Sequence, residues 1–195
     1  MNIVRSTLGI VDMQTEYVPG EGCTSYIEKR CELVSNILHL ADSTLSRNGR
    51  VIFINTDGHG ENIPELEYLK GYQKVVSFTK FYNSLLHFDN IPRFNQIQNS
   101  STMKKSLLGD EFLIVGVNAS WCVLETAKSV KKLRESDPKY GATITVPFSA
   151  TMNIPYPESL TGSPELLKIN EVQSVRSEYM KYVGKDVLVG RSFFE

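Results

Sequence analysis

Short apolar segments that alternate with helix-like segments constrain the fold of this chain most strongly. Two examples are RVIFINT (residues 50–56) and EFLIVGV (residues 111–117), which are nearly continuous apolar runs. A strand that is apolar on both faces is typical of a parallel sheet covered by helices on both sides, because a strand with one solvated face alternates apolar and polar residues. The sequence therefore predicts an α/β fold.

Six strands and three helices can be placed along the chain from its apolar pattern. Strands are expected within residues 6–12, 50–56, 74–80, 111–117, 141–147 and 185–190, and helices over 26–45, from residue 122 onward and within 164–182. The six-stranded sheet is expected to be mostly parallel, because helical segments separate its strands. With 195 residues and no linker, repeat or low-complexity tract, the chain is expected to form a single domain over residues 1–195.

Charge and cysteine content narrow the kinds of partner that the chain is expected to bind. The formal net charge is −1 and charged residues make up 22% of the chain, which gives no electrostatic basis for binding nucleic acid or a membrane surface. No apolar run reaches membrane-spanning length, and the first residues lack the features of a secretory signal. The three cysteines form no CxxC pair, which favours reduced thiols and a cytoplasmic location. The expected partner is therefore a small molecule.

Three reactive residues are expected at the same edge of the predicted sheet. Asp12 closes the first strand, Lys80 closes the third, and Cys122 follows the fourth at the start of a helix. Open parallel sheets bind ligands at the carboxyl ends of their strands. A helix start and a neighbouring ammonium lower the pKa of a thiol, and a carboxylate can carry protons between a thiol and a leaving amine. The arrangement therefore predicts an activated cysteine, with Lys80 as the cation and Asp12 as the proton carrier.

Each of these residues also has an ordinary structural interpretation. Cys122 can be a small core residue, Lys80 a solvated residue at a strand end, and Asp12 the N-cap of a short turn. Placement alone leaves both interpretations open for each residue. A second cysteine, Cys31, falls among apolar residues at helical spacing within 26–45, which predicts that it faces the core.

Three motifs follow one another along the chain: LGIVDMQTEYV, FTKFYNSLL and VGVNASWCVLETA. The residues that define them are Asp12 and Gln14 in the first motif, Lys80 and Ser84 in the second, and Cys122, Val123, Thr126 and Ala127 in the third. The chain thereby resembles the isochorismatase-like cysteine hydrolases, a family that includes nicotinamidases, N-carbamoylsarcosine amidases and ureidoacrylate amidohydrolases. The resemblance covers most of the chain and favours the catalytic interpretation of Asp12, Lys80 and Cys122.

The resemblance implies a three-layer α-β-α sandwich, the isochorismatase-like hydrolase fold, and a thioester mechanism. In that mechanism the thiolate of Cys122 attacks an amide or ureido carbonyl, Asp12 carries the proton to the departing amine, and Lys80 stabilises the charges. Water then hydrolyses the acyl-enzyme. The resemblance also implies a cis peptide bond between Val117 and Asn118, and an oxyanion hole formed by the N–H groups of Asn118 and Cys122.

The chain departs from the nicotinamidase pattern at the metal site. Nicotinamidases hold a metal near the nucleophile with an Asp-x-His segment and a further histidine before the lysine. Asp57 and His59 match the first part, but no histidine lies between His59 and Lys80. His87 follows the lysine, and His39 lies inside the first predicted helix. Two ligands hold a divalent metal poorly, so we expect no metal and no cofactor, and a polar loop near the pocket; a metal is the less favoured alternative.

The sequence points to a class of reaction without specifying the substrate. The favoured function is a cysteine amidohydrolase that cleaves a small amide or ureido substrate at a non-peptide C–N bond. Tyr17 and Trp121 are candidate walls for a flat or apolar substrate, and ordinary core positions are equally compatible with their placement. The alternatives are a catalytically silent binding or assembly module, a nicotinamidase, and an isochorismatase, which is disfavoured because isochorismatases do not use the cysteine nucleophile. By resemblance, a homo-oligomer is expected.

Overall fold

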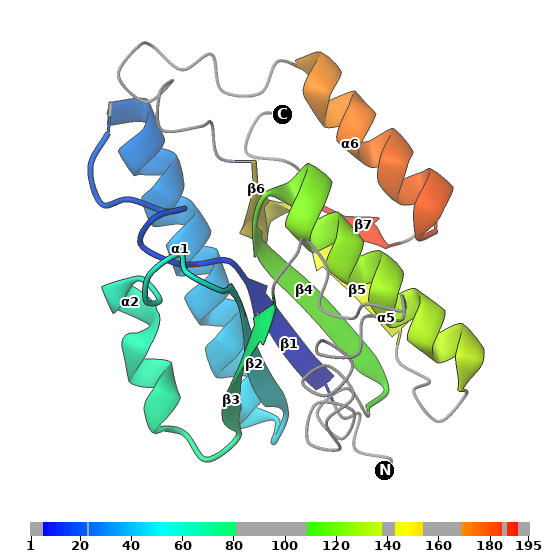
Figure 1. Cartoon of the computed structure of the whole chain (residues 1–195), viewed down its shortest axis with the longest axis horizontal. Helices are drawn as coiled ribbons and strands as arrows, with labels where there is room; N and C mark the ends of the chain where they lie inside the picture. The colour runs from blue at the N-terminus through cyan, green and yellow to red at the C-terminus, as the bar shows by residue number, and fades with distance from the viewer. Residues whose placement is uncertain are drawn as a thin grey trace.

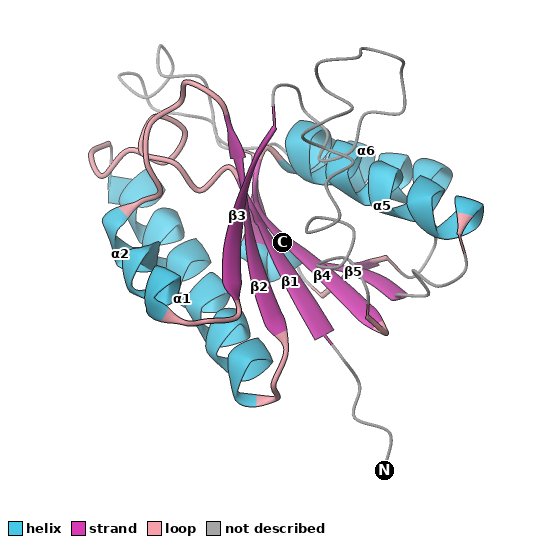
Figure 2. Ribbon diagram, turned by 60° about the horizontal axis from the view of Figure 1, so that its bottom comes forward, coloured by secondary structure: helices cyan, strands magenta, loops and turns pink. Residues whose placement is uncertain are grey.

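A single sheet forms the middle of the protein, with helices on both of its faces (Figures 1 and 2). The structure is a computed structural model that describes residues 6–22, 24–80, 109–137, 143–153, 169–184 and 187–190. Its strands are β1 (Ser6–Val11), β2 (Arg50–Thr56), β3 (Val75–Lys80), β4 (Glu111–Val117), β5 (Thr143–Pro147), β6 (Thr151–Met152) and β7 (Leu188–Val189). Its helices are α1 (Thr24–Ser46), α2 (Pro64–Glu67), α5 (Leu124–Ser136) and α6 (Ile169–Tyr182). The short turns are η1 (Tyr68–Gly71), the π-helical turn η2 (Ala119–Val123) and η4 (Phe148–Ala150).

The sheet has the strand order β3-β2-β1-β4-β5-β7, and each pair of these strands is parallel in the described part of the chain. All six strands expected from the sequence are present, and the α/β fold class with helices on both faces of the sheet is confirmed. One further short strand, β6, pairs with the end of β4, beyond the segment that pairs with β5. Its two residues are too few to give a periodic pattern, so the sequence did not predict it.

Alternation of side chains along the strands divides the core into two parts, one on each face of the sheet. Leu8 and Ile10 of β1 pack in the cluster that contains the buried face of α1. Val11 and Ile54 pack in the cluster that contains the buried faces of α5 and α6. Figure 2 shows α1 and α2 on one side of the sheet and α5 and α6 on the other. Both faces of the sheet are therefore buried, which explains why its strands are apolar on both faces.

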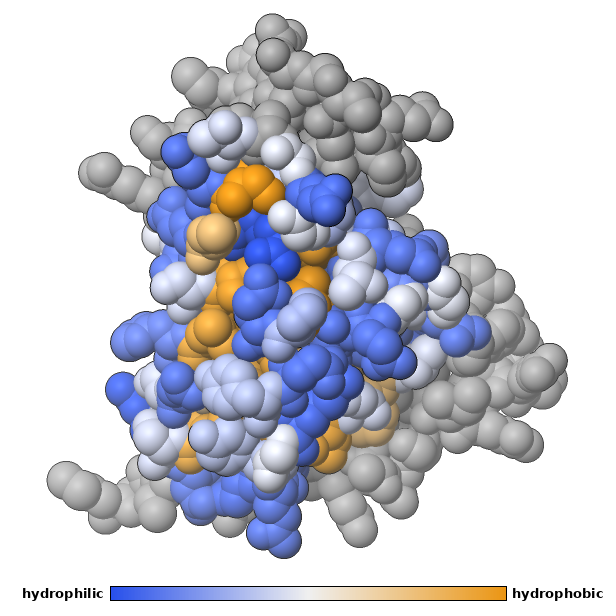
Figure 3. All heavy atoms as spheres, turned by 90° about the vertical axis from the view of Figure 1, so that its left-hand side faces the viewer, coloured by the Kyte–Doolittle hydropathy of each residue, from blue (hydrophilic) through white to orange (hydrophobic). Residues whose placement is uncertain are grey.

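The outer surface of the α1 and α2 layer is largely hydrophilic. Figure 3 shows this side of the molecule, where blue hydrophilic side chains predominate and apolar ones occupy the areas between them. Among the described residues, no helix has the length and apolar content needed to cross a membrane.

Helix α1 departs from the expected burial pattern at Cys31. Cys31 is exposed, whereas the sequence pattern placed it in the core. The buried position one residue earlier belongs to Arg30, whose guanidinium forms an ion pair with Glu65 at 2.7 Å. Successive side chains on an α-helix are turned by roughly 100° from each other, so burial of Arg30 directs Cys31 towards solvent. The prediction that Cys31 faces the core is therefore wrong.

Strands β1 and β4 mark the point at which the strand order reverses. The chain adds β2 and β3 on one side of β1, and then β4 and β5 on the other. The carboxyl ends of two such strands border a crevice, because the connections that follow them leave on opposite faces of the sheet. The strands approach closely at Gly116, where φ is 123° and a Cβ would lie 2.1 Å from the carbonyl oxygen of Val11. Only glycine fits this position, directly before the turn that carries Cys122.

Candidate active site

The centre of the site is a buried ion pair between Asp12 and Lys80. Asp12 directly follows β1, and Lys80 is the last residue of β3. Nζ of Lys80 lies 2.8 Å from Oδ2 of Asp12, and the two side chains are 1% and 0% exposed. Both charges have left water, so neither residue has the solvated or capping role that the sequence alone allowed. Taking two charges out of water is costly, and each now depends on the other for compensation.

Thr56 completes this pair, although no sequence motif pointed to it. Thr56 is the register partner of Lys80 across β2 and β3, so the two side chains point to the same face of the sheet. Its hydroxyl donates to Oδ1 of Asp12 at 2.8 Å and accepts from Nζ of Lys80 at 2.8 Å. The available signal was its position, because Thr56 ends a strand at the same edge of the sheet as Asp12 and Lys80.

Cys122 joins the ion pair from a later segment of the chain. It lies in the π-helical turn η2 between β4 and α5, and it is 5% exposed. Its side chain hydrogen-bonds with both Asp12 and Lys80. The structure thus brings all three predicted catalytic residues together at the carboxyl edge of the sheet. Their catalytic roles stay predictions.

The protonation state of Cys122 differs from the one expected. Burial, followed by the negative charge of Asp12, raises the pKa of Cys122 to about 12, and the nearby charge of Lys80 lowers it by less. The expectation that the helix start and Lys80 together would depress this pKa is therefore wrong. The resting group is a neutral thiol at physiological pH, so any nucleophilic role requires a base that removes its proton during the reaction.

The peptide bond that precedes Asn118 corrects a second expectation. No peptide bond in the described residues is cis, so the bond between Val117 and Asn118 is trans. The sharp change of direction instead comes from Asn118 itself, which has φ 60° and ψ 56°. Asparagine adopts this left-handed conformation more readily than most residues. The oxyanion hole predicted at the N–H groups of Asn118 and Cys122 stays a prediction.

Two side chains from the later part of the chain fix the turn that carries Cys122. Asn153 accepts a hydrogen bond from the N–H of Ser120 at 2.9 Å and donates one to the Ser120 hydroxyl at 2.7 Å. The hydroxyl of Tyr179, on α6, donates to the carbonyl oxygen of Ala119 at 2.8 Å. Tyr179 is 1% exposed, so this anchor is inside the core. The turn is therefore held in place by packing and hydrogen bonds that no local motif encodes.

Aromatic residues lie at the border of the site. The ring of Tyr17 stacks on His59, with a centroid distance of 4.6 Å and an interplanar angle of 26°. Partial burial raises the pKa of Tyr17, a hydrogen bond with Thr56 opposes that rise, and the negative charge of Asp12 adds to it, which places the phenol near the reactive groups. Trp121 is 60% exposed, which excludes a core position for it. Their role as substrate walls stays a prediction.

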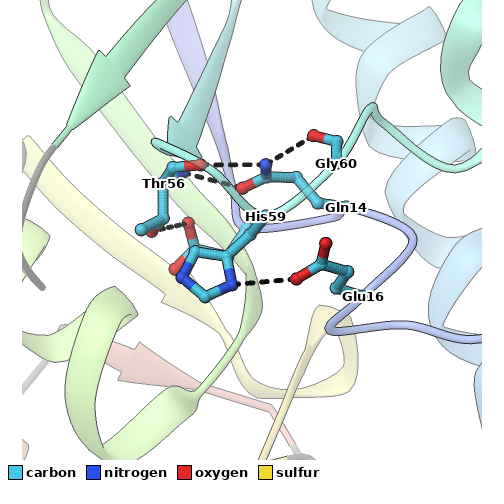
Figure 4. Close-up of polar contacts among 6 residues, drawn as sticks. Gln14, Glu16, Thr56, His59 and Gly60 are labelled. Carbon is cyan, nitrogen blue, oxygen red and sulfur yellow. Dashed lines mark hydrogen bonds and ion pairs between the residues drawn. The ribbon is translucent and has the colours of Figure 1, made fainter.

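The loop after β2 does not provide a metal site in the described part of the chain. Nδ1 of His59 lies 3.2 Å from Oε2 of Glu16 (Figure 4), and Asp57 is exposed. Within the ranges that the structure describes, no group of three or more histidine, cysteine, aspartate or glutamate side chains could hold a metal ion. His87 lies outside the described residues. The described residues therefore do not fit the metal site of nicotinamidases.

Gln14 ties the loop after β2 to the end of β1 (Figure 4). Its side-chain amide donates to the carbonyl oxygens of Thr56 at 3.0 Å and Gly60 at 2.8 Å. Its side-chain oxygen accepts the N–H of Thr56 at 2.7 Å. Gln14 is 1% exposed, and it therefore acts as an internal brace for the segment that contains Thr56.

Comparison with known proteins gives a clear result for the fold. The sequence matches no protein-family model and no curated relative. The structure matches the nicotinamidase SaPncA from Staphylococcus aureus with a TM-score of 0.61 and 15% identity, over 96% of this chain and 99% of that one. It matches N-carbamoylsarcosine amidase from Thermoplasma acidophilum with a TM-score of 0.58 and 15% identity, over 94% and 95% of the two chains. Isochorismatase-like hydrolases are among the other matches.

The chain has the isochorismatase-like hydrolase fold. This fold also occurs in the MAR1 ribonuclease from Caenorhabditis elegans, which matches with a TM-score of 0.51 and 20% identity over 98% of both chains. Matches over the full chain at such low identity show a shared fold, and a shared fold does not specify the reaction.

Proposed function

We propose that the protein is a cysteine amidohydrolase that cleaves a small amide or ureido substrate at a non-peptide C–N bond through a thioester intermediate. The observation that carries the proposal is the buried contact of the Cys122 thiol with the Asp12–Lys80 ion pair, at the edge where open parallel sheets bind ligands. A nucleophile, a base and a cation thus lie in contact with one another. Two proteins with the same fold are amidases by name, which supports C–N bonds as the target.

Acylation starts from the neutral thiol. Asp12 accepts the proton of Cys122 while the sulfur attacks the substrate carbonyl carbon, so a C–S bond forms and the carbonyl oxygen becomes an oxyanion. Proton transfer has to accompany the attack, because the pKa of Cys122 is raised to about 12 and the resting sulfur is protonated. Lys80 remains positively charged beside Asp12 and balances the negative charge that passes through the site.

The leaving group departs with the proton that Asp12 has taken. Asp12 gives this proton to the substrate nitrogen, the C–N bond breaks, and ammonia or an amine leaves. In our proposal the N–H groups of Asn118 and Cys122 donate to the oxyanion, and one such donor typically contributes about two to three orders of magnitude in rate. Tyr17 and Trp121, at the border of the site, are the proposed contacts for a flat or apolar part of the substrate.

Deacylation restores the enzyme. A water molecule gives a proton to Asp12 and attacks the thioester carbon, the C–S bond breaks, and the proton returns to the sulfur of Cys122. The sum is one amide and one water converted into one carboxylic acid and one molecule of ammonia or amine. A ureido substrate gives the corresponding carbamic acid in place of the carboxylic acid.

A substrate screen tests this proposal. Purified protein is incubated with nicotinamide, with ureido compounds and with carbamoyl amides, and ammonia release is measured against the Cys122→Ala variant. We expect release from at least one class and none from the variant. RNA is assayed in parallel, because one protein of this fold is a ribonuclease. Absence of release from every class, or RNA cleavage in its place, contradicts the proposal.

A further inference from the structure

The hydroxyl of Thr56 joins the two charged groups of the site into a closed ring. It donates to Oδ1 of Asp12 and accepts from Lys80, and Lys80 also donates to Oδ2 of Asp12, each bond being 2.8 Å long. A hydroxyl has a single proton to donate, and here that proton goes to the carboxylate. Both carboxylate oxygens therefore receive one directed hydrogen bond from within this ring.

This ring controls the orientation of the Asp12 carboxylate. The last side-chain torsion of an aspartate is soft, so a carboxylate held at one oxygen alone can rotate over a broad range. A second hydrogen bond on the other oxygen fixes the carboxylate plane. Proton transfer depends steeply on the geometry of donor and acceptor, so this plane matters for the exchange with Cys122.

Thr56 is itself held by contacts that do not involve the charged groups. The two hydrogen bonds between Gln14 and the Thr56 main chain fix the backbone of this residue on both its N–H and its carbonyl side (Figure 4). The register of β2 against β3 places Thr56 opposite Lys80. The hydroxyl therefore has a defined position before any substrate is present.

We propose that Thr56 is a positioning residue that orients the carboxylate of Asp12 for proton transfer from Cys122, and that Gln14 holds Thr56 in place. The inference rests on the proposed function, because it assigns a role within that proton transfer. It predicts that the hydroxyl of Thr56, rather than its bulk, is what the site requires.

Paired substitutions of Thr56 separate the hydroxyl from the shape of the side chain. Thr56→Val keeps the shape and removes the hydroxyl, and we expect kcat to fall by about 10- to 100-fold with little change in KM. Thr56→Ser keeps the hydroxyl, and we expect it to recover most of the wild-type kcat. Thr44→Val is the matched control, since Thr44 is a buried threonine in the last turn of α1, next to the start of β2. Wild-type kcat in Thr56→Val, or failure of Thr56→Ser to recover it, overturns the inference.

A measurement without substrate separates this inference from the proposed function. Alkylation of Cys122 by iodoacetamide requires loss of the same proton, and peptide mass spectrometry follows it at this residue alone. We expect the rate constant for Cys122 to fall by about 10-fold in Thr56→Val and to recover in Thr56→Ser. If wild-type protein hydrolyses no amide but shows this pattern, the proposed function fails and the role of Thr56 stands. If Thr56→Val is alkylated like the wild type, the role of Thr56 is overturned whether or not the wild type hydrolyses amides.

Discussion

Two ion pairs of nearly equal length occupy very different surroundings in this protein. Lys80 and Asp12 meet at 2.8 Å with side chains 1% and 0% exposed, and Arg30 and Glu65 meet at 2.7 Å with side chains 9% and 40% exposed. The second pair joins α1 to α2 and stays in contact with water through Glu65. The first has lost its water entirely, which costs free energy that mutual attraction offsets only in part. Burial of that kind is better explained by chemistry than by stability.

A cysteine accompanies each pair, which makes the comparison closer. Cys122 hydrogen-bonds with Asp12 and Lys80 at the carboxyl edge of the sheet. Cys31 follows Arg30 on the exposed side of α1. The same three kinds of group, a carboxylate, a cation and a thiol, therefore occur twice. Only the buried set lies where the sheet can bind a ligand.

Replacing the cation of each ion pair should give the largest difference between the two pairs, and that difference is in activity. Lys80→Met should lower kcat/KM by about 10²- to 10⁴-fold, because Asp12 loses the charge that holds it and balances it. Arg30→Met should leave the activity unchanged, because Arg30 lies on the α1–α2 side of the molecule. Ammonia release from the same substrate measures both variants. Similar activity in the two variants would contradict the claim that only the buried pair serves catalysis.

The free energy of unfolding should also fall more in Lys80→Met than in Arg30→Met. Lys80→Met leaves a buried carboxylate without a compensating positive charge, at a cost of about 3–5 kcal/mol, whereas loss of a half-solvated pair costs about 1 kcal/mol or less. Urea unfolding at neutral pH measures both free energies. The double variant Asp12→Asn with Lys80→Met removes both charges and should be more stable than Lys80→Met alone. A double variant that is less stable argues against charge as the cause.

Much of the fold was predictable because its signals are local. Strands that are for the most part apolar on both faces, separated by helical segments, indicate a parallel sheet covered on both faces without any long-range information. The carboxyl ends of those strands then gave Asp12, Lys80 and Cys122 as candidates for one site. These elements carry their own pattern, so they can be identified one at a time.

The remaining features depend on contacts between distant segments. The role of Thr56 follows from the register of β2 against β3, and the burial of Arg30, which exposes Cys31, follows from Glu65 on another helix. Burial also reversed the expected shift in the pKa of Cys122, because a helix start and a cation act locally whereas desolvation depends on the whole core.

The two thiols should react with alkylating agents in an order set by exposure. Cys31 is exposed, whereas Cys122 is 5% exposed and the pKa of its thiol is raised to about 12. In the absence of substrate, we expect iodoacetamide at pH 7.5 to label Cys31 first, by about 10-fold or more. Peptide mass spectrometry of partly labelled protein measures both sites. Faster labelling of Cys122 would indicate a thiolate in the resting site.

The smallest expected effect is a loss of stability at alkaline pH in the wild type relative to Cys122→Ala. Burial raises the pKa of Cys122 to about 12 in the folded chain, whereas an unperturbed thiol ionises near pH 9.0. The unfolded chain therefore binds fewer protons above that pH, and the stability linked to Cys122 is complete below pH 9 and is lost as the pH rises towards 12. At pH 10 the wild type should have lost about 1 kcal/mol relative to Cys122→Ala, compared with their difference at pH 7. Urea unfolding at the two pH values measures this change, and parallel pH dependence of the two proteins contradicts it.

Capture of the thioester tests the central claim most directly, because it asks whether the sulfur of Cys122 becomes bonded to the substrate carbon. Wild-type protein is mixed with whichever amide releases ammonia in the screen, quenched in acid within the first turnovers, and digested for peptide mass spectrometry. We predict an adduct on the Cys122 peptide equal to the substrate acyl group, no such adduct on the Cys31 peptide, and neither adduct nor ammonia from Cys122→Ala. Ammonia release at the wild-type rate by Cys122→Ala would contradict the account.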